Sequence, residues 1–138
     1  MKIISSEKEL NKVYKYLENN LPSNAIILLR GNLASGKTTL TKYIAEAKGI
    51  KDSVSSPTFS LQNCYGNTIF HYDLYRIDNG EFMELGLFEE FEKDGWHIVE
   101  WASEELEIFL RDVGYSVSVV DITPIDNRRE YSIKCDNV

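Results

Sequence analysis

The sequence predicts an α/β protein, a single three-layer domain with a mostly parallel central sheet and antiparallel additions. Residues 25–29 form an unbroken apolar run, which is typical of a strand buried on both faces inside a parallel sheet. A loop bracketed by glycines and a helix-compatible run follow this strand directly. Strand-like and helical segments then alternate, which favours helices packed against both faces of a sheet. Because 138 residues allow one sizeable core, we expect one domain over residues 1–138.

The loop over residues 31–38 has the form G-x-x-x-x-G-K-T, the pattern of a nucleotide phosphate-binding loop. Its glycines let successive backbone N–H groups point at a phosphate chain, and the following helix adds its positive N-terminal end. We expect Lys37 to reach the β- and γ-phosphates and the Thr38 hydroxyl to ligate Mg²⁺. The sequence therefore predicts a P-loop NTPase-like fold with these nucleotide-binding residues: Gly31, Ala34, Ser35, Gly36, Lys37, Thr38 and Thr39.

The segment before the loop predicts an amphipathic helix over residues 7–19. Ser6 and Glu9 have the spacing of a capping box at its start, and apolar side chains then recur at helical spacing. Pro22 ends this helix before the strand at residues 25–30.

After the loop, a helix is expected from Thr38 to Gly49. A hydroxyl-rich turn and two β-prone segments, residues 59–65 and 68–75, come next. Only a Gly-Asn pair separates these two segments, so we expect a tight hairpin. The remaining elements are predicted as a helix, a strand, a helix capped by Ser103 and two strands, over residues 81–91, 96–101, 104–110, 115–122 and 130–135.

Composition narrows the function classes. A net charge of -7 argues against the broad basic surface that direct nucleic-acid binding needs, so we expect any nucleic acid to be held by a partner. No apolar run is long enough to span a membrane, and residues 1–7 lack the apolar core of a signal peptide. Cys64 and Cys135 stand far apart without metal-ligand spacing, which predicts reduced thiols, no disulfides and a cytoplasmic protein.

Two carboxylates are candidates for the chemistry beside a bound nucleotide. In P-loop enzymes the acidic residues that complete Mg²⁺ coordination and position a water lie where apolar strands end. Asp73 and Glu100 both have this position. We expect one of them to hold Mg²⁺ directly or through water, and the other to stabilise that shell or activate the attacking water. The residues leave the assignment of the two roles open.

Other side chains near these positions give weaker signals. Thr58, in a turn after a Ser-Pro pair, is a candidate switch hydroxyl that contacts the γ-phosphate or its Mg²⁺. His71 and His97 fit strand packing better than a ligand or base role. Arg76 fits either a phosphate contact or a structural ion pair, and Trp101 fits either the core or a surface that meets a partner.

Five stretches of the chain stand in the order and spacing of one family: residues 31–39, 56–61, 71–76, 84–87 and 99–101. The phosphate loop alone does not distinguish families, whereas the Ser-Pro-Thr-Phe, Asp-Leu-Tyr-Arg and Val-Glu-Trp elements do. Together they resemble the TsaE family (also called YjeE), the ATPase component of bacterial tRNA threonylcarbamoyladenosine (t6A) synthesis.

This resemblance implies a cytoplasmic ATPase that binds ATP and Mg²⁺, is slow alone and drives turnover of a TsaD–TsaB transferase complex. It implies contact with tRNA only through those partners. By motif position, Lys37 and Thr38 take phosphate and Mg²⁺, Asp73 and Glu100 serve the metal and hydrolysis, and Thr58 lies in a switch-like loop.

The family also surrounds the adenine with residues near the N-terminus and late in the chain. Ser6 and the Asn127 and Arg128 turn stand at about those places here, although no motif fixes them. Three features depart from the family pattern. In the loop, Asn32, Ala34 and Ser35 replace the usual Asp, Gly and Ala, and Ala34 therefore has a Cβ where the family has none. After the Glu-Trp pair, Ala102 replaces a proline. We expect binding to survive these changes, and the loss of a carboxylate at Asn32 to alter metal affinity or hydrolysis.

Two other functions fit the same loop. A small metabolite kinase needs a lid of basic residues over the transferred phosphate, and the only basic cluster is the Arg128 and Arg129 pair. A nucleotide-sensing interaction module with negligible turnover would use every residue that an ATPase uses, so only kinetics separates those two.

Overall fold

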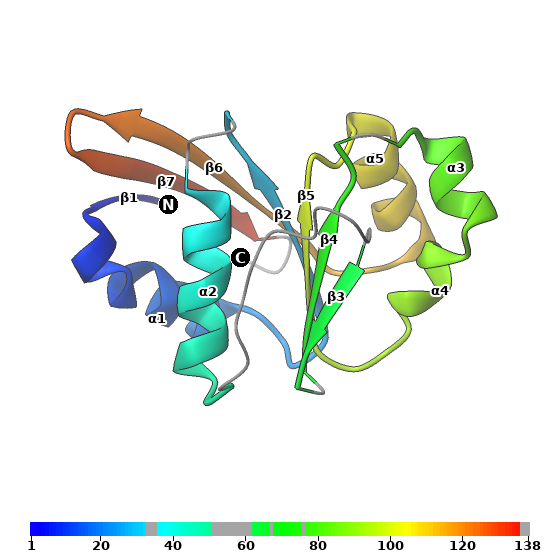
Figure 1. Ribbon diagram of the computed structural model, residues 1–138, viewed down its shortest axis with the longest axis horizontal. Coiled ribbons are helices and arrows are strands. Elements are labelled where there is room, and N and C mark those ends of the chain that lie inside the picture. Colours follow the sequence, from blue (N-terminus) through cyan, green and yellow to red (C-terminus); the bar gives the residue numbers. More distant parts are fainter. Residues whose placement is uncertain (33–35, 51–61, 67, 76, 136–138) are drawn as a thin grey trace.

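The computed structural model describes residues 1–32, 36–50, 62–66, 68–75 and 77–135. Within them, a seven-stranded sheet of order β1-β7-β6-β2-β5-β4-β3 carries helices against both faces (Figure 1). The strands are β1 (Lys2–Ser5), β2 (Ala25–Arg30), β3 (Gln62–Tyr65), β4 (Ile69–Asp73), β5 (Trp96–Glu100), β6 (Val117–Ile125) and β7 (Arg128–Cys135). The helices are η1 (Glu7–Glu9), α1 (Asn11–Asn20), α2 (Lys37–Ala47), α3 (Asn79–Glu84), α4 (Leu87–Glu90) and α5 (Glu104–Val113).

The centre of the sheet is parallel, as the sequence predicts. Strands β6, β2, β5 and β4 run in the same direction. The outer strands are added by antiparallel pairing, β7 on β6 and β1 on β7 at one side, and β3 on β4 at the other. In the register of these strands, Leu29 pairs with Glu100, and Glu100 pairs with Asp73. The carboxyl ends of β2, β5 and β4 therefore lie next to one another at one edge of the sheet.

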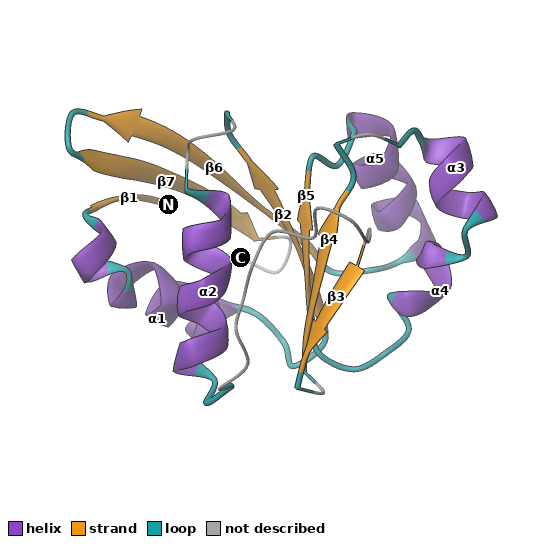
Figure 2. Ribbon diagram, viewed as in Figure 1, coloured by secondary structure: helices purple, strands orange, loops and turns teal. Residues whose placement is uncertain are grey.

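Helices cover the two faces as separate layers, with α1 and α2 on one side and α3, α4 and α5 on the other (Figure 2). Alternate residues of β2 supply both cores. Ile27 and Leu29 pack with the apolar side chains of α1 and α2, whereas Ile26 and Leu28 pack with those of α3 and α5. Burying both faces of β2 accounts for its unbroken apolar sequence.

The N-terminal segment departs from the prediction. The sequence does not predict β1, because a four-residue strand with mixed exposure has no clear period, and its pairing with β7 stabilises it instead. The helix predicted from residue 7 begins as the 3₁₀ turn η1 and becomes α-helical only at Asn11. Ser6 makes no side-chain cap to the backbone; its Oγ donates to the Glu9 carboxylate at 3.1 Å.

Elements in the second half match in type and differ in bounds. The helix predicted over residues 81–91 is two short helices, α3 and α4, which meet at Gly86 with a φ of 72°. β5 ends one residue early, since Trp101 has a φ of 65°. The predicted Ser103 cap is confirmed, because its Oγ accepts a hydrogen bond from the Leu106 backbone N–H at 3.0 Å.

Both hairpins differ in length from the prediction. β6 and β7 are longer, so only Asp126, at a φ of 53°, and Asn127 form the turn between them. Pro124 is accommodated within β6 because the pairing of β6 with β2 stops at Asp121, which leaves that side free of ladder bonds. β3 and β4 are joined by three residues rather than two, because Thr68 belongs to the turn.

Cys64 and Cys135 are both free thiols, as expected. Among the described helices, none combines the length and the apolar character needed to cross a bilayer.

Gly95 tests the packing at the start of β5. Its φ is +140°, and a Cβ there would lie 2.5 Å from the Thr68 carbonyl oxygen. We expect Gly95→Ala to lower the free energy of unfolding by about 2 to 4 kcal/mol, because the cost of the strained backbone is added to the cost of the steric clash. Gly114→Ala is the control: its φ is +108° with nothing within 4 Å of the added Cβ, so about 1 kcal/mol is expected. Equal losses of unfolding free energy in the two variants, measured by urea unfolding, would contradict the close contact between Gly95 and the Thr68 carbonyl oxygen.

Candidate functional site

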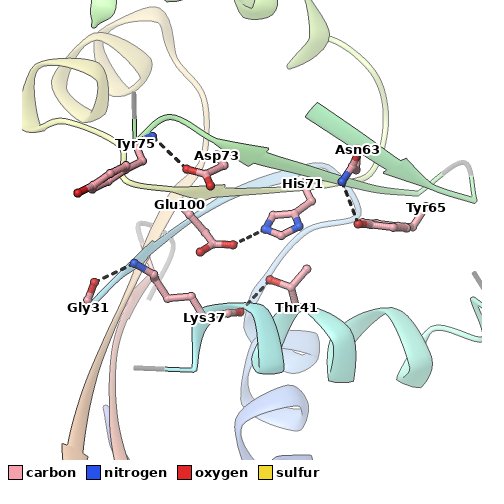
Figure 3. Close-up of polar contacts among 9 residues, drawn as sticks. All are labelled: Gly31, Lys37, Thr41, Asn63, Tyr65, His71, Asp73, Tyr75 and Glu100. Atoms are coloured by element: carbon pink, nitrogen blue, oxygen red, sulfur yellow. Dashed lines mark hydrogen bonds and ion pairs between the residues drawn. The ribbon is translucent and has the colours of Figure 1, made fainter. Parts of the chain in front are cut away.

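The candidate site lies at the edge of the sheet where β2, β5 and β4 end and α2 begins (Figure 3). Gly31 follows β2, Lys37 is the first residue of α2, and Asp73 and Glu100 are the last residues of β4 and β5. Parallel pairing brings these segments together although they are far apart in the sequence. The structure thus brings together four residues that the sequence singles out.

Lys37 is almost completely buried, with 3% of its surface exposed. Its Nζ donates to the Gly31 carbonyl oxygen at 2.8 Å and lies 3.6 Å from the ring centroid of Trp101. Burial lowers the pKa of Lys37, while the charges of Glu100 and Asp73 act in the opposite direction. A carbonyl and an aromatic face therefore hold this cation at the mouth of the loop, where a phosphate would compete for it.

The two carboxylates differ in their surroundings. Asp73 and Glu100 are direct neighbours across the β4–β5 ladder, so their side chains leave the sheet on the same face. Glu100 is 4% exposed, and its Oε2 lies 2.5 Å from Nε2 of His71. Asp73 is half-buried, and its Oδ1 accepts a hydrogen bond from the Tyr75 backbone N–H at 3.0 Å. Glu100 is the enclosed carboxylate and Asp73 the accessible one.

Trp101 occupies a strained backbone position directly after Glu100. A φ of 65° is uncommon for a bulky residue and costs on the order of 1 to 3 kcal/mol. In this conformation its ring contacts both Lys37 and the Tyr75 ring, the latter edge-on at 4.8 Å between centroids. The sequence left Trp101 either in the core or on a surface that meets a partner. The structure places it half-buried beside Lys37, a position that neither interpretation included.

The donor atoms at this edge suit Mg²⁺. Asp73 and Glu100 offer carboxylate oxygens, and Thr38, beside Lys37 on α2, offers a hydroxyl. Across the described ranges, no cluster of three or more His, Cys, Asp or Glu side chains suited to a metal ion is found. Mg²⁺ normally uses one or two carboxylates together with waters and substrate phosphates, so a small set of hard oxygen donors is the expected kind of site.

Apart from the candidate site, a hollow with a volume of about 410 Å³ lies between the N-terminal turn and the β6–β7 hairpin. Ser6, Asn127 and Arg128 all line it, although more than a hundred residues separate the first from the others. The structure therefore brings together the three side chains that the family resemblance assigns to the adenine.

Arg129 connects this hollow to the loop, and the sequence pattern did not single it out for that place. Its Nη2 lies 3.2 Å from the Glu7 carboxylate, and a Cβ on Gly36 would come within 2.4 Å of its Nη1. Nη1 is buried and makes no hydrogen bond within the described part of the chain, so a donor is available for an anion. The strand predicted over residues 130–135 begins two residues earlier, at Arg128. With that start, the alternation of a strand places Arg129 on the same face as the buried Tyr131, which is the signal that could have identified it.

The two histidines are buried in strands, as expected, but on opposite faces of the sheet. His97 Nε2 donates to the Lys93 carbonyl oxygen at 2.7 Å, so Nδ1 of the neutral ring accepts from the Tyr72 hydroxyl at 2.6 Å. Burial lowers the pKa of His97, which agrees with a neutral ring. His71 instead contacts Glu100, which the sequence analysis did not anticipate. The signal was its spacing of two from Asp73, which puts both on one face.

Several expected site residues lie outside the described part of the chain: Ala34, Ser35, Thr58 and, among the alternatives, Arg76. Thr39 is described and lies half-buried in the first turn of α2.

The fold and the loop at its centre define a P-loop-like α/β protein, a class that receives phosphate groups at the N-terminus of the helix after the loop. The family model "Threonylcarbamoyl adenosine biosynthesis protein TsaE" matches residues 4–130. The chain therefore belongs to the TsaE family.

Individual relatives agree with this assignment. The tRNA threonylcarbamoyladenosine biosynthesis protein TsaE of Bacillus subtilis is 35% identical, in a match that covers 82% of this chain and 77% of that protein. The protein of the same name from Rickettsia typhi is also 35% identical, with 99% and 96% covered. The crystal structure of Bacillus subtilis YdiB superposes with a TM-score of 0.70 at 27% identity, covering 98% of this chain and 84% of that one.

Arg129 yields a prediction about nucleotide affinity. We expect Arg129→Ala to weaken ATP binding about tenfold or more, because it removes a buried charged donor beside the helix N-terminus. Lys134→Ala removes an exposed cation from the same strand and should leave the affinity unchanged. Titration calorimetry compares the two variants, and equal affinities would remove Arg129 from the site.

Proposed function

We propose that this protein is an ATP-binding and ATP-hydrolysing subunit that supports t6A modification of tRNA by driving turnover of a TsaD–TsaB transferase complex. The observation that carries the proposal is the gathering of Lys37, Asp73 and Glu100 around the N-terminus of α2. Membership of the TsaE family and the printed names of its relatives support the pathway.

In this proposal the phosphates lie on the loop from Gly31 to Thr39, against backbone N–H groups that include those of Ala34, Ser35 and Gly36. The adenosine extends toward the hollow lined by Ser6, Asn127 and Arg128. Lys37 exchanges the Gly31 carbonyl oxygen for phosphate oxygens, which are better partners for a buried cation because they carry charge.

Bound Mg²⁺ would screen the phosphate charge and polarise the bond to the γ-phosphate. Thr38 and one of the two carboxylates, Asp73 or Glu100, would hold it, directly or through water. The carboxylate not committed to the metal orients the attacking water and accepts its proton. Burial suits Glu100 to that second task, since few waters compete for its oxygens. Thr58 would contact the γ-phosphate and so distinguish ATP from ADP.

The partners follow from the family and from the charge of the chain. TsaD- and TsaB-like proteins are the proposed partners, and the net charge of -7 supports contact with tRNA only through them. Because its relatives are named for tRNA modification, we propose a cytoplasmic location.

A substitution of Glu100 distinguishes a role in ATP binding from a role in ATP hydrolysis. We expect Glu100→Ala to keep ATP affinity within a few-fold of wild type while turnover falls about 100-fold or more, because a general base contributes 10² to 10⁴ in rate. Equilibrium binding of ATP and single-turnover hydrolysis measure the two effects separately. Glu46→Ala, near the C-terminal end of α2, is a control that removes an exposed carboxylate from the end of the helix opposite the loop.

Unchanged turnover in Glu100→Ala would move the catalytic role to Asp73. Loss of ATP binding together with turnover would instead make Glu100 a binding residue. A wild-type protein that binds ATP but does not hydrolyse it would favour the nucleotide-sensing alternative.

A further inference from the structure

His71 makes the closest polar contact to Glu100 in the described part of the chain. The ring comes from β4 and the carboxylate from β5, and Nε2 lies 2.5 Å from Oε2. Both groups are enclosed, with 0% of the His71 side chain and 5% of the Glu100 side chain exposed. Figure 3 shows the Glu100 carboxylate between the His71 ring and the Lys37 side chain.

An enclosed carboxylate needs hydrogen-bond donors, because its charge has lost most of its water. We assign Nε2 of His71 as the donor here, since a carboxylate oxygen accepts. The second ring nitrogen, Nδ1, is buried and has no hydrogen-bond partner among the described residues. Among the described residues, the hydrogen bond to Glu100 is therefore the one that the His71 ring makes.

The contact also fixes which oxygen of Glu100 remains available. With Oε2 bound to His71, Oε1 is the oxygen left for groups bound at the loop. Without His71, Oε2 would lose this donor, and repulsion between the neighbouring carboxylates of Asp73 and Glu100 would favour other rotamers of Glu100.

We propose that His71 is a positioning residue, which holds Glu100 in one rotamer and presents its Oε1 to the bound nucleotide and Mg²⁺. His71 itself contacts neither. This inference rests on the proposed function for the role of Glu100, but the contact itself can be tested without nucleotide.

The chain offers a matched control in His97. It is equally buried, lies on the neighbouring strand β5 and also makes short hydrogen bonds, but it faces the opposite core, where its partners are Tyr72 and Lys93. Any general cost of removing a buried histidine from this sheet should appear in both positions.

Four variants separate positioning from packing: His71→Met, His71→Gln, His97→Met and His97→Gln. Methionine fills a similar volume without a donor, whereas the glutamine amide nitrogen can take the place of Nε2. We expect His71→Met to lower kcat about 10- to 100-fold without a matching rise in KM, because a hydrogen bond to a charged group is lost. His71→Gln should recover most of that loss. Both His97 variants should keep kcat near wild type, even where thermal unfolding shows them destabilised.

A second readout uses the protein without nucleotide. In long-range ¹H–¹⁵N spectra of the imidazole rings, we expect His71 to carry a proton on Nε2, with a resonance that shifts strongly in Glu100→Gln. The His97 resonances should not respond to that substitution.

The inference is overturned if the His71 resonances ignore Glu100→Gln, or if His71→Met behaves like His97→Met in kcat. Failure of glutamine to rescue would also contradict it. Failure of the proposed function has a different signature, namely absence of hydrolysis in the wild type, and the imidazole spectra then still decide whether His71 holds Glu100.

Discussion

The parallel register of β2, β5 and β4 is the constraint on which the rest of the site depends. It aligns Leu29 with Glu100 and Glu100 with Asp73, so that the loop after β2 opens beside two carboxylates. A slip of one residue in either ladder would send a carboxylate to the opposite face, into the core against α3 and α5. Such a slip is opposed because it would bury a carboxylate among apolar side chains without polar partners, and in this way the cores position the chemistry.

The site places several charged groups where water is scarce. Lys37 and Glu100 are both nearly buried, and each has polar partners that offset part of the cost of losing water: Gly31 and Trp101 for the lysine, His71 for the glutamate. Such an arrangement tolerates a charged ligand well, because a phosphate and a metal ion can replace or extend contacts that already exist. Trp101 is held at a positive φ within it, which is consistent with strain concentrated at a functional position.

The sequence predicts the parts of this structure in which one local pattern determines the outcome. An apolar strand followed by G-x-x-x-x-G-K-T predicts β2 and α2, and apolar runs that end in an acidic residue locate Asp73 and Glu100. His71 and Arg129 were harder to assign, because their roles come from contacts between strands that are distant in the sequence. The strand β1 has too few residues to show a period, and Gly86 interrupts a helical pattern whose apolar spacing continues across it.

The most direct test of the account is ATP hydrolysis by the purified protein, measured alone and with the cognate TsaD–TsaB pair. Lys37→Ala serves as the blank, because it removes the cation that we propose binds the phosphates. We expect slow turnover by the protein alone, a clear rise when the pair is added, and neither in the blank. An unchanged rate with the pair present, while ATP binding is intact, would contradict a partner-coupled ATPase.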